Sequence, residues 1–375
     1  MKRIIPFFLI ISVLLTSCQH QSNIENPESE IKAVWISCYD YICASGKTAD
    51  EYKAITDEMF GNIAGKGLNT AFVHMRAFCD SFYKSDIFPY SEYIAGTQGG
   101  MLAFDPFEIL LASAEKYNIE IHAWINPFRI SYSTDISLLC DSSPAKKLIE
   151  QGNQNGEICV LESGIYLNPA SPQAQKIVFD GIREILGKYQ LSGIHIDDYF
   201  YPSTDEEIDK NQYSYYLASG GRLPIDEWRR ENVNAFVAAM YSLIKSYGEN
   251  ITVSISPSGD IESNLNKHFA DVALWLSQKG YADMIIPQIY FGFEHETQPF
   301  ETLLHEWGKL KRNKSTVLLC GIAAYKSGKK DEYAGKGKNE WSENSDVVDR
   351  QIEAVRSNPN YGGYALFSYS DIVGK

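Results

Sequence analysis

Eight short, β-rich apolar runs alternate with helical segments along most of the chain, and this alternation restricts the fold more than any other feature. The runs cover residues 32–38, 68–76, 119–126, 193–196, 250–256, 283–290, 316–322 and 363–368. Helical spacing between them is seen, for example, at Tyr52, Ile55, Met59 and Ile63. Eight strand and helix units are the number in a TIM (β/α)8 barrel. We predict one such α/β domain over residues 31–375, with an eighth helix that is short or missing.

The first 30 residues do not follow this pattern. Lys2 and Arg3 precede an apolar run over residues 4–15, and the chain continues through Leu15-Thr16-Ser17 to Cys18. A basic start and a short apolar run are typical of a signal peptide, and the run is too short to span a bilayer. The end of the run resembles a bacterial lipobox. We predict a lipoprotein signal peptide over 1–17 and a flexible tether over 18–30. The lipid on Cys18 would hold the barrel to a membrane in the cell envelope, outside the cytoplasm.

The net charge and the cysteine spacing limit which ligands and partners the protein can bind. The formal net charge is −14 at pH 7, which disfavours binding to nucleic acid. The chain has seven cysteines, and the six that follow Cys18 match no zinc-binding spacing. An exported protein could pair some of them, but their spacing fixes no connectivity.

The stretch Gly193–Pro202 carries the strongest chemical signal. A short apolar strand ends there in two adjacent acids, Asp197 and Asp198, followed by Tyr199, Phe200 and Tyr201. Active sites of (β/α)8 barrels lie at the carboxyl ends of the strands, where these acids fall. Adjacent acids repel each other and are poor strand formers, so a packing role does not explain them. A helix N-cap is the structural alternative. We predict that Asp197 and Asp198 are the catalytic residues.

Other strand ends and their loops carry polar and aromatic residues that we predict to bind the substrate. They are Arg76, Asp80, Tyr83, Trp124, Asn126, Arg129, Asn168, Tyr199, Tyr201, Gln288 and Tyr290. Asn168 belongs to a long insertion between the third and fourth strands, whose length indicates a binding loop. Structural alternatives exist: Arg76 could pair with an acid, and Trp124 could belong to the core.

An acid pair suits glycoside hydrolysis. Side chains of neighbouring strand residues diverge, so Asp197 and Asp198 are poorly placed on opposite sides of one glycosidic bond. Either one of them works with another carboxylate, such as Asp260 or Glu294, or the 2-acetamido oxygen of the substrate attacks in place of an enzyme nucleophile. We favour the second scheme by analogy with hexosaminidase barrels, with Asp197 orienting the acetamido group and Asp198 as acid/base.

Three histidines, His74, His122 and His195, lie on successive strands and raise the question of a metal site. Metal-dependent barrel hydrolases usually need a paired His-x-His and further ligands on later strands, which this sequence lacks. We interpret the three as core histidines and predict no metal and no cofactor.

Several motifs together resemble those of the glycosyl-hydrolase-like, family-ten-type lipoproteins of bacterial envelopes. The motifs are Ala33–Ile36, Arg76 with Asp80 and Tyr83, Asp105-Pro106, His122–Pro127 with Arg129, Leu167–Pro169, Gly193–Pro202 and Pro287–Tyr290. The resemblance implies a TIM barrel and a cell-wall glycan substrate, peptidoglycan strands without stem peptides. Two other readings stay open: a non-catalytic glycan-binding surface lipoprotein, and a metal-dependent hydrolase or deacetylase.

Overall fold

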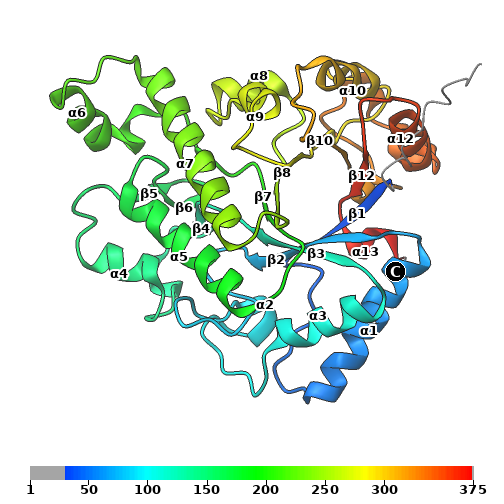
Figure 1. The fold of residues 1–375 in the computed structure, drawn as a ribbon, viewed down its shortest axis with the longest axis horizontal. Helices are drawn as coiled ribbons and strands as arrows, with labels where there is room; N and C mark the ends of the chain where they lie inside the picture. Colours follow the sequence, from blue (N-terminus) through cyan, green and yellow to red (C-terminus); the bar gives the residue numbers. More distant parts are fainter. Residues whose placement is uncertain (1–29, 374–375) are drawn as a thin grey trace, which may run out of the picture. The chain divides into compact units, whose positions relative to one another are not determined.

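Parallel strands form a ring at the centre of the structure (Figure 1), a computed structural model that describes residues 30–373. The strands are β1 Ile31–Ile36, β2 Thr70–Arg76, β3 Glu120–Ile125, β7 Gly193–Ile196, β8 Thr252–Ile255, β9 Met284–Ile285, β10 Val317–Leu318, β11 Cys320–Ile322 and β12 Gly363–Leu366. Their order is β10-β9-β8-β7-β3-β2-β1-β12-β11. Only Leu319 separates β10 from β11, so one stretch of chain joins the two ends of the sheet. The nine strands thus occupy eight positions, and the predicted TIM barrel is confirmed.

Helices surround the ring and cover its outer face (Figure 1). The longer ones are α1 Ala49–Gly65, α3 Pro106–Lys116, α5 Pro172–Lys188, α6 Lys210–Ala218, α7 Ile225–Tyr247, α10 Phe300–Lys309 and α12 Val347–Arg356. The shorter ones are α2 Glu92–Ala95, α4 Pro144–Glu150, α8 Ile261–Asn266, α9 Val272–Ser277, α11 Glu340–Glu343 and α13 Tyr369–Ile372. Local sequence sets several starts: Thr48 and Glu51 form a capping box on α1, and Asp105 caps α3 ahead of Pro106. Within residues 30–373, no helix has the length and apolarity needed to cross a bilayer.

The insertion after β3 has regular structure of its own. It forms a three-stranded antiparallel sheet of β4 Arg129–Ser131, β5 Ile158–Leu161 and β6 Gly164–Leu167, in the order β4-β6-β5. The expectation of a long binding loop therefore missed these strands, which are only three or four residues long. Because β4 begins four residues after β3 ends, the small sheet starts at the mouth of the barrel.

The last helix, α13, is short, as the sequence predicted, and Asp40 holds it in place. The Asp40 carboxylate accepts hydrogen bonds from the Ser368 hydroxyl at 3.0 Å and the Ser370 backbone N–H at 2.9 Å. It also accepts from the Ser37 backbone N–H at 2.7 Å, just beyond β1. These bonds join the end of the chain to its first strand, so closure does not depend on a long eighth helix.

The geometry of strand β7 determines where Asp197 and Asp198 lie. A Cβ on Gly193 would lie 2.6 Å from His122 Nδ1 and 2.7 Å from the Thr252 carbonyl oxygen, so only glycine fits between the neighbouring strands. Ile194 and Ile196 pack in the main apolar core, whereas His195 points inward and accepts from the Trp35 indole at 3.0 Å. Alternation along the strand then places Asp197 on the inner side, at the mouth.

Candidate active site

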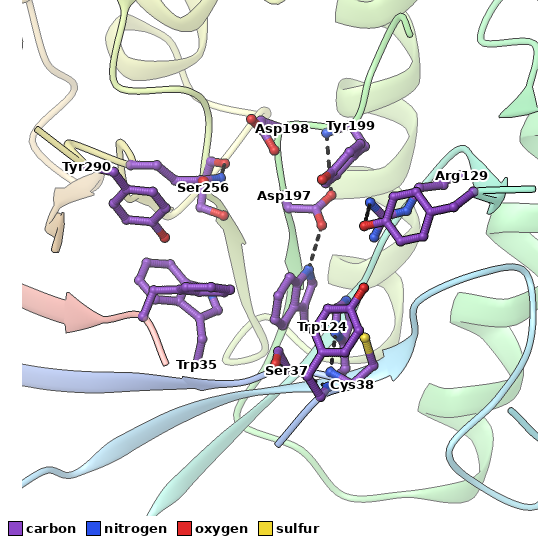
Figure 2. A pocket seen from close by; sticks show the side chains of 15 residues that line it. Trp35, Ser37, Cys38, Trp124, Arg129, Asp197, Asp198, Tyr199, Ser256 and Tyr290 are labelled. Atoms are coloured by element: carbon purple, nitrogen blue, oxygen red, sulfur yellow. Dashed lines mark hydrogen bonds between the residues drawn. The ribbon is translucent and has the colours of Figure 1, made fainter. Parts of the chain in front are cut away.

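Asp197 is buried at the carboxyl end of β7, and no cationic side chain among residues 30–373 forms an ion pair with it. Its side chain is 2% exposed, and Oδ2 accepts a hydrogen bond from the Trp124 indole N–H at 3.0 Å (Figure 2). The Asn126 amide and the Tyr199 backbone N–H lie 3.5 Å from its two oxygens. Burial and, to a lesser extent, the neighbouring Asp198 charge raise the pKa of Asp197 to about 7, against the opposing effects of Arg129 and of the Trp124 hydrogen bond. Asp197 can therefore exchange a proton near neutral pH.

Asp198 is half-buried and lines the same cavity. Burial raises its pKa, while His268 and a hydrogen bond from the Gln288 amide favour the ionised form. The chain after Asp198 runs through turns, and the next helical residues begin at Glu206. A helix N-cap role for the pair is therefore excluded. Their carboxylates point in different directions (Figure 2), as expected for neighbours at a strand end.

The cavity holding the two acids has a volume of about 210 Å³. Its walls come from most of the barrel strands, with aromatic rings on several sides (Figure 2). The lining residues are Trp35, Ser37, Cys38, Tyr39, His74, Trp124, Arg129, Tyr132, Asp197, Asp198, Tyr199, Ser256, Gln288, Tyr290 and Phe367. Five of the predicted substrate-binding residues line the cavity, namely Trp124, Arg129, Tyr199, Gln288 and Tyr290. A sixth, Asn126, lies at its edge, with its amide 3.5 Å from Asp197.

Arg129 is held among aromatic rings rather than in an ion pair. Its guanidinium carbon lies 4.1 Å from the Tyr199 ring centroid, 4.4 Å from that of Tyr132 and 4.7 Å from that of Phe78. Its backbone N–H donates to the Asn126 side chain at 3.0 Å, which shapes the turn between β3 and β4. The Arg129 charge favours the ionised form of Asp197 without an ion pair between them in the described part of the chain.

Arg76 is not in the cavity, although alternation on β2 predicts it beside His74. The pairing of β2 with β3 shifts register between His74 and Arg76. The guanidinium consequently lies outside the cavity, donating to the carbonyls of Asn126 at 2.7 Å and Pro127 at 2.6 Å. Its placement stabilises the turn that carries Arg129 and corrects the expected direct contact with substrate.

Three more predicted residues are buried away from the cavity. Tyr83 donates to Glu184 at 2.8 Å, and the Asn168 amide donates to the carbonyls of Gly156 at 2.8 Å and Ile208 at 3.2 Å. Tyr201 is 1% exposed and lies over Arg229. Asp80 lines a separate groove next to the cavity. Burial excludes Tyr83, Asn168 and Tyr201 from direct contact with a ligand in this structure.

Sequence reasoning missed several lining residues. Tyr39 and Tyr132 are 62% and 53% exposed at the rim, and both follow a strand end by a few residues, a position that could have identified them. His74 was interpreted as a core residue, yet it lines the cavity and stacks on Trp124 with ring centroids 3.4 Å apart. Its Nδ1 accepts from the Cys38 backbone N–H at 3.0 Å, and burial lowers its pKa. The neutral ring therefore carries its proton on Nε2.

The other two histidines have hydrogen-bond partners inside the barrel. His122 Nδ1 lies 3.1 Å from the Ser254 hydroxyl, and His195 Nδ1 lies 3.0 Å from the same oxygen. Among residues 30–373, no group of three or more His, Cys, Asp or Glu side chains could hold a metal ion. Asp260 caps α8, and neither it nor Glu294 lines the cavity.

Comparison with known proteins specifies the family of this TIM barrel, which carries an acid pair and aromatic rings at its strand ends. The sequence matches the family model described as Glycosyl hydrolase-like 10 over residues 30–341, so the chain belongs to this family. It is 30% identical to glycosyl hydrolase YngK of Bacillus subtilis, over 99% of this chain and 74% of the relative. It is 26% identical to glycosyl hydrolase DigH of Escherichia coli K12, over 80% and 72%.

Solved structures share the fold at low sequence identity. The catalytic domain of beta-amylase from Paenibacillus polymyxa superposes with a TM-score of 0.56 at 10% identity, covering 92% of this chain and 94% of that one. A GH20 exo beta-N-acetylglucosaminidase from Vibrio harveyi gives 0.51 at 11% identity, covering 93% and 52%. At these identities the likeness concerns the fold alone, and it agrees with the ring of strands described above.

Proposed function

We propose that the protein hydrolyses glycosidic bonds in N-acetylated cell-wall glycan, namely peptidoglycan strands that lack stem peptides. The observation that carries the proposal is the composition of the cavity: Asp197 and Asp198 are the only acids among its lining residues. Because the two neighbouring carboxylates point in different directions, a mechanism with two opposed carboxylates would need a third acid, and none lines the cavity within residues 30–373. A 2-acetamido group on the substrate would supply the missing nucleophile, which restricts the substrate to N-acetylated sugars.

The two acids would divide the work as follows. Protonated Asp198 donates its proton to the glycosidic oxygen while the acetamido carbonyl oxygen attacks C1 and the C1–O bond breaks. Ionised Asp197, held by Trp124, accepts the acetamido N–H and stabilises the positive charge of the cyclic intermediate. Asp198 then removes a proton from water, which attacks C1 and reopens the ring. The anomeric configuration is retained, and Asp198 ends protonated as it began.

The choice of peptidoglycan and of the envelope extends beyond the family assignment. It rests on the motifs shared with envelope lipoproteins and on the lipobox that ends at Cys18, which lies outside the described residues. The aromatic rim and the Asp pair are compatible with an amino-sugar polymer as partner. The proposed location is the cell envelope, with the barrel attached to a membrane through the lipid.

Product analysis by mass spectrometry tests the proposal. The full-length protein is incubated with peptide-free peptidoglycan strands, with peptide-bearing sacculi and with a neutral glucan. We expect short sugars from the bare strands alone. Asp198→Asn should lower turnover by about 10²–10⁴-fold, the usual contribution of a general acid.

Matched acid controls make the assignment specific. Asp260→Asn and Glu294→Gln remove carboxylates outside the cavity and should leave turnover near that of the parent protein. Near-parental turnover in Asp198→Asn, with loss in either control, would contradict the assigned acid. Retention of bare strands without any cleavage would instead support the non-catalytic glycan-binding reading.

A further inference from the structure

A groove of about 700 Å³ lies next to the active-site cavity, and the mechanism above makes no use of it. One wall comes from the loop around α2, and the other from the insertion that follows β4. Polar side chains are spread along it, and the more accessible ones include Glu92, Gln98, Ser131, Ser133 and Lys146, whereas Asp80 is 2% exposed. Such a lining suits a ligand rich in hydroxyl groups.

The groove and the cavity share a wall. Tyr132 lines both, and three further contacts join residues of one to residues of the other. Tyr39, in the cavity, meets Tyr93, in the groove, edge to face with ring centroids 5.4 Å apart. Phe78, in the groove, lies 4.7 Å from the Arg129 guanidinium and 5.1 Å from the Tyr132 ring. The two hollows are thus separated only by an aromatic ridge.

Two members of the aromatic ridge, defined as Tyr39, Phe78, Tyr93 and Tyr132, are open to solvent. Tyr39 is 62% exposed and Tyr132 is 53% exposed, and both also line the cavity. Each of the three tyrosines offers an apolar ring face to the C–H groups of a sugar and a hydroxyl group for a hydrogen bond, while Phe78, which is 8% exposed, packs against the Tyr132 ring. The ridge can therefore carry a sugar chain from one hollow to the other.

We propose that the groove is a second glycan-binding site, which holds the sugar units that continue beyond the bond cut at Asp198. This inference rests on the proposed function. The cavity of about 210 Å³ is smaller than the roughly 300–1,000 Å³ of pockets that enclose a drug-sized ligand, so it holds one sugar unit and the polymer must extend outside. The groove beyond Tyr132 is the adjoining space with matching chemistry. The enzyme then prefers long strands to short ones, because binding energy from remote units lowers the barrier at the reacting bond.

Filling the groove without touching the cavity tests this. Thr97 is an exposed groove residue, and its backbone carbonyl, which a substitution retains, accepts from the Gly100 N–H at 3.0 Å. Thr97→Trp should lower kcat/KM on long strands by on the order of tenfold and leave the shortest cleavable oligosaccharide unaffected. Thr97→Ala, at the same position, should behave as the parent. Ser137→Trp fills the groove from the opposite wall and should reproduce the effect if both variants fold.

A binding measurement separates the two proposals. Calorimetry with long and short peptide-free strands is done in the Asp198→Asn background, where turnover is not needed. Weaker binding of long strands alone in Thr97→Trp supports the groove even if no substrate is cleaved, in which case only the proposed hydrolysis fails. Equal binding of long strands by the tryptophan and alanine variants overturns the groove, and so does equal affinity of the Asp198→Asn protein for long and short strands. Either result would leave the proposed hydrolysis to be tested by the product analysis described above for Asp198→Asn.

Discussion

Two buried aspartates follow strand β7, and their surroundings differ in one respect. Asp209 is fully buried, and Arg229 donates to both of its oxygens, from Nε at 2.8 Å and from a terminal nitrogen at 2.6 Å. Asp197 is also buried, but its nearest donor is the neutral Trp124 indole, and it forms no ion pair with any residue between 30 and 373. The Asp209 carboxylate has a bidentate counter-ion, whereas the Asp197 carboxylate accepts hydrogen bonds from neutral donors and interacts with the Arg129 charge only at longer range.

This difference indicates which of the two aspartates is catalytic and which is structural. A buried charge with a bidentate partner is held in one state, whereas an unpaired one is near the point of taking up a proton. The aromatic residues follow the same division. Tyr201 and Phe269 lie 5.3 and 5.1 Å from the Arg229 guanidinium carbon and shield the Asp209–Arg229 pair. Tyr199 lies against Arg129 at the cavity. The run Tyr199–Tyr201 thus contributes one ring, Tyr199, to the cavity and another, Tyr201, to the shield around the Asp209–Arg229 pair.

The largest expected effect comes from breaking the paired site. Arg229→Met leaves the Asp209 charge buried without a partner and should lower the free energy of unfolding by about 3–5 kcal/mol. Urea denaturation measures it. The double variant Arg229→Met, Asp209→Leu should recover most of the loss, and the folded fraction of either should keep its turnover. A loss below about 1 kcal/mol in the single variant would show that the Asp209–Arg229 pair contributes no more to folding stability than a surface ion pair.

The unpaired site should respond in the opposite direction. Because the folded-state pKa of Asp197, about 7, exceeds its ordinary value, the folded protein binds more protons than the unfolded one between about pH 4 and pH 7. The raised pKa of Asp197 therefore does not lower the free energy of unfolding below about pH 4, where the carboxyl is protonated in both states. It lowers the free energy of unfolding progressively as pH rises from about 4 to 7. Asp197→Asn keeps an oxygen for Trp124 and should raise the free energy of unfolding at pH 8 by up to about 4 kcal/mol.

At pH 4 the same Asp197→Asn substitution should be nearly neutral. Denaturation curves of the parent and the variant at several pH values measure the difference. Asp209→Asn is the matched control and should destabilise at pH 8, since it weakens the pair with Arg229. Destabilisation by Asp197→Asn at pH 8, greater than at pH 4, would contradict the raised pKa.

A smaller effect is expected from the hydrogen bond that positions Asp197. Trp124→Phe removes a donor to a charged acceptor, an interaction of about 1.5–3 kcal/mol. The pKa of Asp197 should rise further, so the limb of the pH–rate profile on which activity falls with decreasing pH moves to higher pH. Trp307→Phe is the control, because its indole donates to the Gly259 carbonyl and to neither acid, and Trp307 does not line the cavity. An unshifted profile in Trp124→Phe would show that the indole does not tune the acid.

Much of the fold could be predicted because its determinants are local. The helical spacing over residues 52–63 falls within α1, and the expected strand at 193–196 has the bounds of β7. The predicted strand over 283–290 was too long: β9 ends at Ile285, and Pro287 has no N–H to offer a ladder. The strands of the insertion are short pairings between distant segments, for which apolar periodicity gives little signal.

The sequence by itself determined the order of strands and helices, and it placed Asp197 and Asp198 at a strand end, because periodicity and the carboxyl-end rule depend on neighbouring residues only. Tertiary structure decided which polar residues reach the cavity. A register shift on β2 takes Arg76 out of it and leaves His74 in, and packing buries Tyr83 and Tyr201 elsewhere. The physical reason is that side-chain direction at a bulge, and the presence or absence of a counter-ion, depend on segments distant in sequence.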